Sequence, residues 1–471
     1  MSSEAGRTSG YRYRFTAEQQ IVLDEGGSRA GLVSGFHIGD ERIAQAFGSV
    51  LPVKLADFTD VLAAVHMADR ISPRSRSAGR SARDNWCRRL HLEIPVRNPA
   101  LWQDPAIREA LWDTLGYLTD DEWEFDFVAR AGKARVSESQ HFLFRNPPEP
   151  PVSAALFSGG LDSLAGLCQE LAARPRDSFV LLSAATSSRL GQRQRELVRQ
   201  LSERSGRRLR TVVVPLGLHQ RGERRRDERS QRTRGFAFTG LGAVTAIAAG
   251  AAELAVYENG IGAINLPYTA AQIGTHSTRS SHPLFLRRME HLIENVTGRS
   301  IRLRLPFLLQ TKAELCALLR GSGWEELIPE TVSCDGFPQR VPGKPQCGVC
   351  TSCVLRRQAL AAAGLTAWDP PDRYRWDVLS PAAEVPGAKL LGLHAMLDQA
   401  NRLLRLTQHD DSYRALARQY PQIAELVCML VREPAEADRL AHELAGMYER
   451  YVHEWNGFPY VSPRNQAPRA A

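Results

Sequence analysis

The stretch Val152-Ser-Ala-Ala-Leu-Phe-Ser-Gly-Gly-Leu-Asp-Ser163 runs directly into the apolar-periodic segment Leu164-Ala-Gly-Leu-Cys-Gln-Glu-Leu-Ala-Ala173. This order predicts a buried strand, a tight glycine turn and a helix, which is the arrangement of a phosphate-binding loop. Gly159 and Gly160 let the backbone approach an oxyanion closely, while the helix start supplies unpaired N–H groups and a positive dipole end. Because the turn lacks the Gly-Lys-Ser/Thr of a Walker P-loop, it predicts a different kind of phosphate loop.

The polar side chains of this turn indicate how phosphate is held. Ser158 and Ser163 place hydroxyl donors at its two ends. The carboxylate of Asp162 would repel phosphate unless a metal ion lies between them, which indicates Mg²⁺. The alternative is an ordinary glycine turn at a strand–helix junction that binds no phosphate. Its serine, glycine and aspartate residues would then match a phosphate loop only by chance.

A second signal is a C-x12-C-x2-C-x2-C cluster made by Cys334, Cys347, Cys350 and Cys353. Four thiolates at this spacing can close a tetrahedral site around Zn²⁺, and Gly348 allows the tight knuckle between two of them. An iron–sulfur cluster is the main alternative. Zinc is favoured because the two C-x2-C steps run into a predicted helix over 354–360. The other four cysteines lie in apolar or helical contexts and are predicted to be small buried hydrophobes.

Together these two features resemble the 7-cyano-7-deazaguanine synthases, a QueC-like family of PP-loop ATP pyrophosphatases, across about residues 152–361. The family's loop reads Ser-Gly-Gly-x-Asp-Ser, and its members activate 7-carboxy-7-deazaguanine by adenylation before converting it to the nitrile. The resemblance implies a parallel-sheet α/β core that uses ATP and Mg²⁺, with zinc on the four cysteines. It implies ATP binding by Ser158, Gly159, Gly160, Leu161, Asp162 and Ser163.

Further site residues follow from the same resemblance. Arg234 stands where the family has an arginine that faces the ATP phosphates, and its fork geometry suits phosphate oxygens. Lys312 lies in Thr311-Lys-Ala-Glu314, which is similar to the family's Thr-Lys-x-Glu helix start, and is expected to add a phosphate contact. Glu258 and Asn259 follow a predicted parallel strand, where ligands bind in such sheets, and are expected to pair with a guanine-like edge.

The chain also departs from the biosynthetic enzyme. About 150 residues precede the core, about 110 follow it, and the family's usual substrate segment is replaced over 265–283. This long form resembles the QatC-like proteins of Qat-type anti-phage defence systems, which implies transfer of the deazaguanine carboxylate to an amine of a partner protein. Thr278, Arg279 and His282 are then expected to hold the carboxylate or relay a proton. A synthase that uses ammonia, a PP-loop tRNA-modifying enzyme and a pseudoenzyme scaffold are the alternatives.

Proline-rich linkers at 146–151 and 368–372 predict three regions. Residues 1–146 are predicted to form an α+β accessory domain, 152–361 the PP-loop core, and 373–471 a helical region. Strands are expected in the first region at 11–15, 90–96 and 123–128, and helices at 58–72 and 105–118. Helices of the last region are expected at 390–406, 412–418 and 435–451.

Composition adds little to this prediction. The net charge of +8 admits a nucleic-acid partner, but only five of the 60 basic residues are lysine. Such a bias toward arginine indicates GC-rich coding rather than phosphate contacts, so nucleic acid is not the favoured partner. An uncharged apolar run of membrane-spanning length and an apolar signal core are both lacking, so a cytoplasmic protein without a membrane partner is expected.

Overall fold

The computed structural model describes residues 9–23, 31–74, 87–219, 228, 230–269, 279–338, 341–380 and 385–459. Its chain forms two compact units, each built from several segments. The first unit comprises Met1–Leu156, Arg176–Val256 and Gly274–Arg304. The second comprises Phe157–Pro175, Tyr257–Ile273 and Leu305–Ala471. Among the described helices, none combines the length and hydropathy that a membrane span requires.

The first unit is built on one mostly parallel sheet with the strand order β10-β9-β6-β7-β8-β3-β2-β1-β4-β5. Its core strands are β6 (Val152–Leu156), β7 (Ser178–Ala185), β8 (Leu209–His219), β9 (Glu253–Val256) and β10 (Arg302–Arg304). Strand β7 is buried along nearly its whole length, as expected for a parallel strand covered by helices on both faces. These core strands confirm the predicted parallel α/β architecture.

The strands of the N-terminal region continue this same sheet. They are β1 (Ser9–Phe15), β2 (Gln20–Leu23), β3 (Gly31–Ile38), β4 (Arg88–Val96) and β5 (Glu122–Ala129). Strand β3 pairs antiparallel with β8, and Ile38 lies opposite Leu216. The proline-rich linker at 146–151 therefore does not mark a break between the compact units, because residues on both sides of it belong to the first one.

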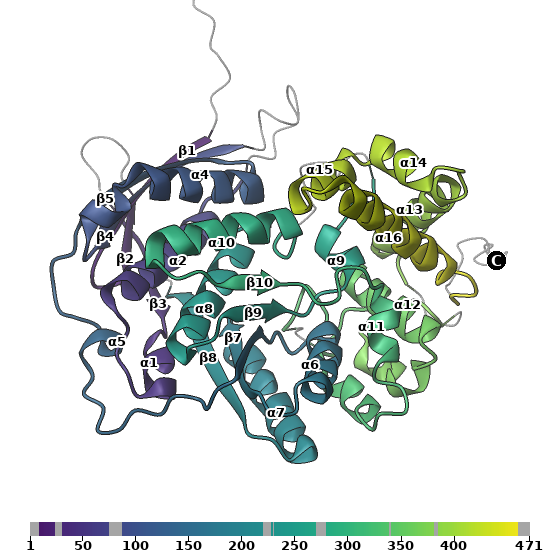
Figure 1. Ribbon diagram of the computed structural model, residues 1–471, viewed down its shortest axis with the longest axis horizontal. Coiled ribbons are helices and arrows are strands. Elements are labelled where there is room, and N and C mark those ends of the chain that lie inside the picture. Colours follow the sequence, from purple (N-terminus) through teal and green to yellow (C-terminus); the bar gives the residue numbers. More distant parts are fainter. Residues whose placement is uncertain are drawn as a thin grey trace, which may run out of the picture. The chain divides into compact units, whose positions relative to one another are not determined.

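Helices cover the sheet of the first unit (Figure 1). They are α1 (Glu41–Phe47), α2 (Val53–Ile71), α3 (Pro99–Trp102), α4 (Pro105–Thr119), α5 (Val136–Ser139), α7 (Ser188–Ser205), α8 (Arg234–Ala249) and α10 (Pro283–Thr297). Helix α8 packs on β6 and β7, and α2 packs on α8. Gly240 permits this close approach, because a Cβ there would lie 2.3 Å from Leu62 Cδ2.

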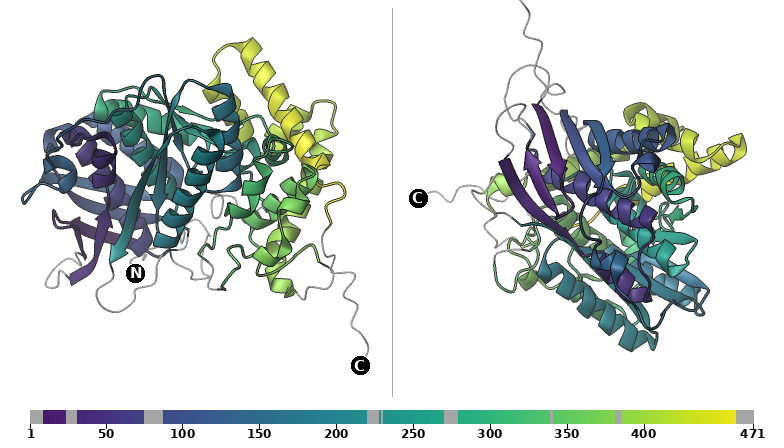
Figure 2. Two further views of the ribbon diagram at one scale, coloured as in Figure 1. Left: turned by 90° about the horizontal axis from the view of Figure 1, so that it is seen from below. Right: turned by 90° about the vertical axis from the view of Figure 1, so that its left-hand side faces the viewer.

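The second unit is helical (Figures 1 and 2). It contains α6 (Leu161–Ala173), α9 (Gly260–Ile264), α11 (Lys312–Ala317) and α12 (Thr351–Ala362), with 3₁₀ turns at Glu325–Glu330, Thr366–Trp368, Pro371–Arg373 and Gly387–Lys389. The last helices are α13 (Leu391–Thr407), α14 (Ser412–Gln419), α15 (Pro421–Leu430) and α16 (Pro434–His453). This bundle confirms the predicted C-terminal helical region.

The predicted and observed elements differ in several places. Helix α6 begins at Leu161 and includes Asp162 and Ser163, whereas apolar periodicity began only at Leu164. The sequence did not reveal the strands β2, β3 and β10 or the helices α1, α3, α5, α9, α10 and α15.

Candidate active site

The glycine turn is held by its own hydroxyl groups. Gly159 has a φ of +78°, in the left-handed region that favours glycine. The Gly160 N–H donates to Ser158 Oγ at 3.2 Å, Ser158 Oγ donates to Ser163 Oγ at 3.3 Å, and Ser163 Oγ donates to the Gly160 carbonyl at 2.9 Å. Gly160 is the N-cap of α6, and no side chain of a described residue caps this helix. The first-turn N–H groups of α6 thus have no intrahelical partner and suit an anion.

Lys312 and Asp162 form the centre of the site. Lys312 Nζ lies 2.6 Å from each carboxylate oxygen of Asp162. The two side chains are only 8% and 12% exposed, respectively. Asn259 Nδ2 donates to Asp162 Oδ2 at 3.3 Å and to Glu258 Oε1 at 2.9 Å. Four residues that the sequence predicted for two ligands, nucleotide and base, therefore lie in one hydrogen-bonded cluster.

Burial and neighbouring charges shift the pKa values of two members of this cluster, Glu258 and Lys312. Burial and the charge of Asp162 raise the pKa of Glu258 well above its usual range. Burial lowers the pKa of Lys312, but the charges of Asp162 and Glu258 outweigh it and raise that pKa above its ordinary value. Lys312 is therefore an ammonium that balances Asp162.

Strand pairing explains why distant segments supply these residues. Strands β6 and β9 are parallel neighbours, with Leu156 opposite Val256. The segments that follow them carry Asp162 and Asn259, and they leave the sheet at the same edge. Parallel strands commonly present ligand-binding residues in this way.

A capping box sets Lys312 at the first residue of α11. Thr311 Oγ1 accepts from the Glu314 N–H at 3.1 Å, and the Thr311 N–H donates to Glu314 Oε2 at 2.8 Å. The Thr-x-x-Glu pattern was a readable signal for this cap. The sequence reasoning assigned a role to Lys312 but not to Thr311 or Glu314.

Two further cysteines lie near these elements. Cys316 of α11 and Cys168 of α6 are both buried. Burial raises the pKa of Cys316 to about 12 and also raises the pKa of Cys168. Both thiols are neutral near pH 7, and neither has the lowered pKa of a nucleophilic cysteine.

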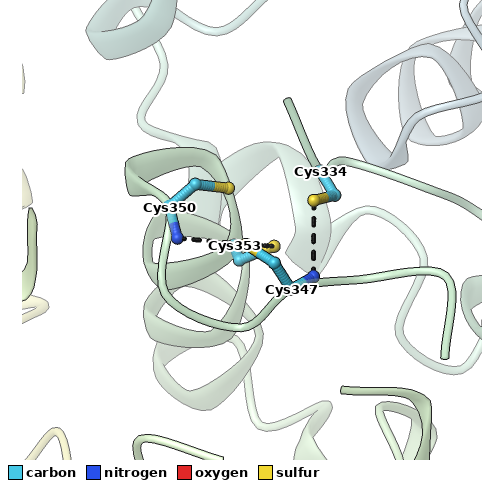
Figure 3. A group of neighbouring side chains, drawn as sticks. All are labelled: Cys334, Cys347, Cys350 and Cys353. Atoms are coloured by element: carbon cyan, nitrogen blue, oxygen red, sulfur yellow. Dashed lines mark hydrogen bonds between the residues drawn. The ribbon is translucent and has the colours of Figure 1, made fainter. Parts of the chain in front are cut away.

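The four predicted metal ligands come together in the second unit (Figure 3). The Sγ atoms of Cys334, Cys347, Cys350 and Cys353 all lie within 4.8 Å of one another. Thiolates bound at ~2.3 Å to a tetrahedral Zn²⁺ are ~3.8 Å apart, close to the 3.9 Å between Cys347 and Cys353. The N–H groups of Cys347 and Cys350 donate to Cys334 Sγ and Cys347 Sγ, both at 3.3 Å. This donor set fits Zn²⁺.

The helix start and a glycine shape this metal centre. Cys350 is the N-cap of α12 and Cys353 lies in its first turn, where the positive end of the helix dipole favours thiolates. Gly348 has a φ of +83°, and a Cβ there would lie 1.9 Å from the Trp376 carbonyl oxygen. The knuckle therefore requires glycine at this position.

The remaining predicted residues belong to the first unit, except that Thr278 lies outside the described residues. Arg279 Nη1 lies 3.2 Å from Asp120 Oδ1, and its guanidinium lies over the Tyr117 ring at 4.9 Å. His282 is the N-cap of α10: its Nδ1 accepts from the Leu284 N–H at 3.2 Å and contacts Tyr117 Oη at 2.9 Å. Burial, followed by the charges of Arg279 and Arg288, lowers the pKa of His282 to about 3. His282 is thus neutral near pH 7.

Arg234 is an exposed residue that begins α8. The start of this helix is held by Asp69 of α2, whose Oδ2 accepts from the N–H and the hydroxyl of Thr233 at 3.0 and 2.8 Å. Arg88 Nη2 donates to Asp69 Oδ1 at 2.7 Å, so the Asp69 charge is paired within the core. A residue of the N-terminal region thus contacts the start of the helix that carries Arg234.

A comparison with known protein families finds a match that covers the C-terminal half of the predicted core. Residues 251–364 match the family model of the queuosine biosynthesis protein QueC. The matched stretch contains Glu258, Asn259 and Lys312 together with the four cysteines, but it does not include the glycine turn at 158–163. No curated protein is a match for this chain.

Proposed function

We propose that this chain is an ATP-dependent ligase that adenylates a 7-carboxy-7-deazaguanine-like carboxylate and transfers the acyl group to an amine. The observation that carries the proposal is the buried Lys312–Asp162 pair at the start of α6, directly after the glycine turn. The QueC match supports the deazaguanine class of substrate, because it covers the residues that complete this cluster.

The chemistry required is the activation of a poor electrophile. A carboxylate that attacks the α-phosphate of ATP becomes an acyl-adenylate, and pyrophosphate leaves. An amine then attacks the acyl carbon, loses a proton and displaces AMP. Donors must stabilise the charge that develops on the departing pyrophosphate.

The described residues suit each of these tasks. Ser158, Ser163 and the first-turn N–H groups of α6 are donors for phosphate oxygens, and we assign a further phosphate contact to Arg234. Asp162 has the carboxylate that Mg²⁺ prefers, and bound Mg²⁺ would neutralise charge on the phosphates. Lys312 holds the Asp162 carboxylate in place and adds positive charge to the site.

The base and its carboxylate require different contacts. The Glu258 carboxyl group and the Asn259 amide supply hydrogen-bonding groups that suit a guanine-like edge. Thr278, Arg279 and His282 remain the proposed contacts of the substrate carboxylate. The four-cysteine centre is proposed to bind Zn²⁺ as a structural ion, because all four ligand positions are taken by cysteines.

The nucleotide products test adenylation. Purified protein with ATP, Mg²⁺ and 7-carboxy-7-deazaguanine is expected to release AMP and pyrophosphate in equal amounts, because the carboxylate attacks the α-phosphate. Anion-exchange chromatography of the nucleotides measures this, and a reaction without the carboxylated base is the control. Release of ADP and orthophosphate would contradict the proposal.

We further propose that the amine belongs to a partner protein in anti-phage defence. Free ammonia requires no docking surface, whereas a macromolecular amine must be positioned closely, since a misplacement of ~1 Å can cost ~100-fold in rate. The N-terminal strands and the C-terminal bundle supply such additional structure.

The QueC match favours a second candidate, the biosynthetic reaction with ammonia that yields the nitrile. A tRNA-modifying enzyme that transfers sulfur would require an accessible nucleophilic cysteine near the loop, whereas Cys168 and Cys316 are both buried.

Intact mass distinguishes the two acceptors. Candidate partner proteins incubated with the enzyme, ATP and the carboxylated base are expected to gain the mass of one deazaguanine acyl group, and ammonia is expected to give little nitrile. Mass spectrometry measures the first product and liquid chromatography the second. Rapid nitrile formation without any gain in protein mass would establish the biosynthetic reaction instead.

A further inference from the structure

The last helix of the chain contacts the segment that carries Lys312. Glu454, immediately after α16, accepts a hydrogen bond from the Thr311 hydroxyl through Oε1. On the same helix, Arg450 Nε lies 2.6 Å from Glu314 Oε1, and Arg450 Nη2 donates to the Leu309 carbonyl at 3.0 Å. Thr311 and Glu314 are the two members of the capping box of α11. The C-terminal region therefore contacts both residues of the capping box that positions Lys312.

The same bundle also contacts the segment that follows Asn259. Met447 of α16 packs against Gly260, where a Cβ would lie 2.3 Å from the Met447 sulfur. Gly260 directly follows Asn259 and begins α9. Gln399 of α13 donates from Nε2 to the carbonyls of Leu266 and Pro267 at 2.9 and 3.2 Å. These contacts join the bundle to α9 and to the residues directly after it, in the segment that begins beside Asn259.

The Glu454 side chain is partly buried at the end of α16. Its Oε2 is buried and has no hydrogen-bond partner among the described residues. Burial raises the pKa of Glu454 to about 7, against the opposing effect of the Thr311 hydrogen bond. A buried carboxylate with one unsatisfied oxygen is costly to a fold unless it has another use.

We propose that Glu454 is a positioning residue: through the Thr311 hydroxyl it fixes the start of α11 and thereby keeps Lys312 against Asp162. The C-terminal helices are then part of the nucleotide site and not only a docking element. This inference rests on the proposed function for its effect on catalysis, but the position of Lys312 is measurable without any substrate.

Lysine labelling reports that position directly. The chain has only five lysines, and Lys54, Lys133 and Lys389 are exposed, so they serve as internal references. At pH 8 a water-soluble succinimidyl ester should label Lys312 roughly tenfold more slowly than these references, because its amine is buried and paired. Glu454→Ala is expected to raise Lys312 labelling several-fold relative to the same references. Peptide mass mapping gives each rate.

Three further variants separate positioning from loss of fold. Glu454→Gln keeps an acceptor for Thr311 and should restore slow labelling. Glu449→Ala removes an exposed carboxylate from the same helix and should change nothing. Arg450→Gln should raise labelling as Glu454→Ala does, which tests the capping box if Glu454→Ala is poorly folded. Unchanged Lys312 labelling in folded Glu454→Ala or in Arg450→Gln, or equally fast labelling in Glu454→Gln, would overturn the proposal.

Activity provides the second measurement. Glu454→Ala should lower the rate of AMP formation by about tenfold or more, and Glu454→Gln should recover most of it. If wild-type protein forms no AMP while the labelling results hold, the proposed function fails and the positioning role stands. If wild-type protein is active and Glu454→Ala is equally active, the positioning role fails and the proposed function stands.

Discussion

Replacing Asp162 with asparagine should lower the rate of AMP formation by about a hundredfold or more, because the charged ligand for Mg²⁺ and phosphate is lost. The same change should destabilise the protein, since Lys312 keeps a charge in a site that is only 8% exposed. Removing one partner of a buried ion pair typically costs about 3–5 kcal/mol. Nucleotide chromatography measures the rate, and urea denaturation measures the free energy of unfolding.

A double variant separates these two effects. Asp162→Asn combined with Lys312→Met removes both charges and should recover much of the lost stability, because no unpaired charge remains. Its activity should stay as low as that of the single variant. Gln169→Ala, an exposed change on the same helix α6, is the control and should leave both quantities near wild type. Recovery of activity in the double variant would mean that Asp162 serves only to neutralise Lys312.

Local patterns predicted the parts of the site that lie close together in sequence. The glycine turn, Asp162 and the C-x2-C steps each depend on spacing within a few residues. The structure forms them as the spacing requires, with Gly159 and Gly348 at positive φ. Apolar periodicity placed the start of α6 three residues too late, because Asp162 and Ser163 are polar residues inside its first turn.

Long-range pairing was not predictable from local patterns. Strand β3 pairs with β8 although more than 170 residues separate the paired positions in the chain. Neither strand has a sequence pattern that predicts which strand it pairs with. Local composition predicts a boundary at 146–151, and it carries no sign that strands on both sides of this linker pair in one sheet. In the same way, nothing near Glu454 indicates that its side chain contacts Thr311.

Some polar residues have partners that the sequence could not reveal. Arg279 and His282 were expected at a substrate carboxylate because a motif placed them there. The structure gives both of them Tyr117 as a partner, and His282 also caps α10. A motif indicates which side chains are available, but only packing shows which of them already have hydrogen-bond partners.

Replacing Cys350 with serine should remove bound zinc and most of the stability of the surrounding structure. A structural Zn²⁺ site can contribute ~10 kcal/mol to the folding of its local unit. The cluster joins three parts of the second unit: Cys334, the Cys347–Cys350 knuckle and the first turn of α12. Gly348 of the knuckle packs against the Trp376 carbonyl. The Trp376 N–H donates to the Cys347 carbonyl at 3.1 Å. Loss of the ion should therefore loosen α12 and the segment that follows it.

Elemental analysis of purified wild-type protein should find about one zinc per chain, the stoichiometry of a single four-thiolate centre. Cys350→Ser should reduce zinc to background and lower the midpoint of thermal unfolding, and removal of zinc from wild type with a chelator should have the same effect. Cys428→Ser is the matched control, because this exposed cysteine of α15 lies outside the cluster. Iron with visible absorbance would identify an iron–sulfur centre instead. Without an ion, the four sulfur atoms within 4.8 Å of one another would share only weak hydrogen bonds, which should lower the stability of the cluster. A metal-free protein of full stability would therefore contradict the zinc assignment.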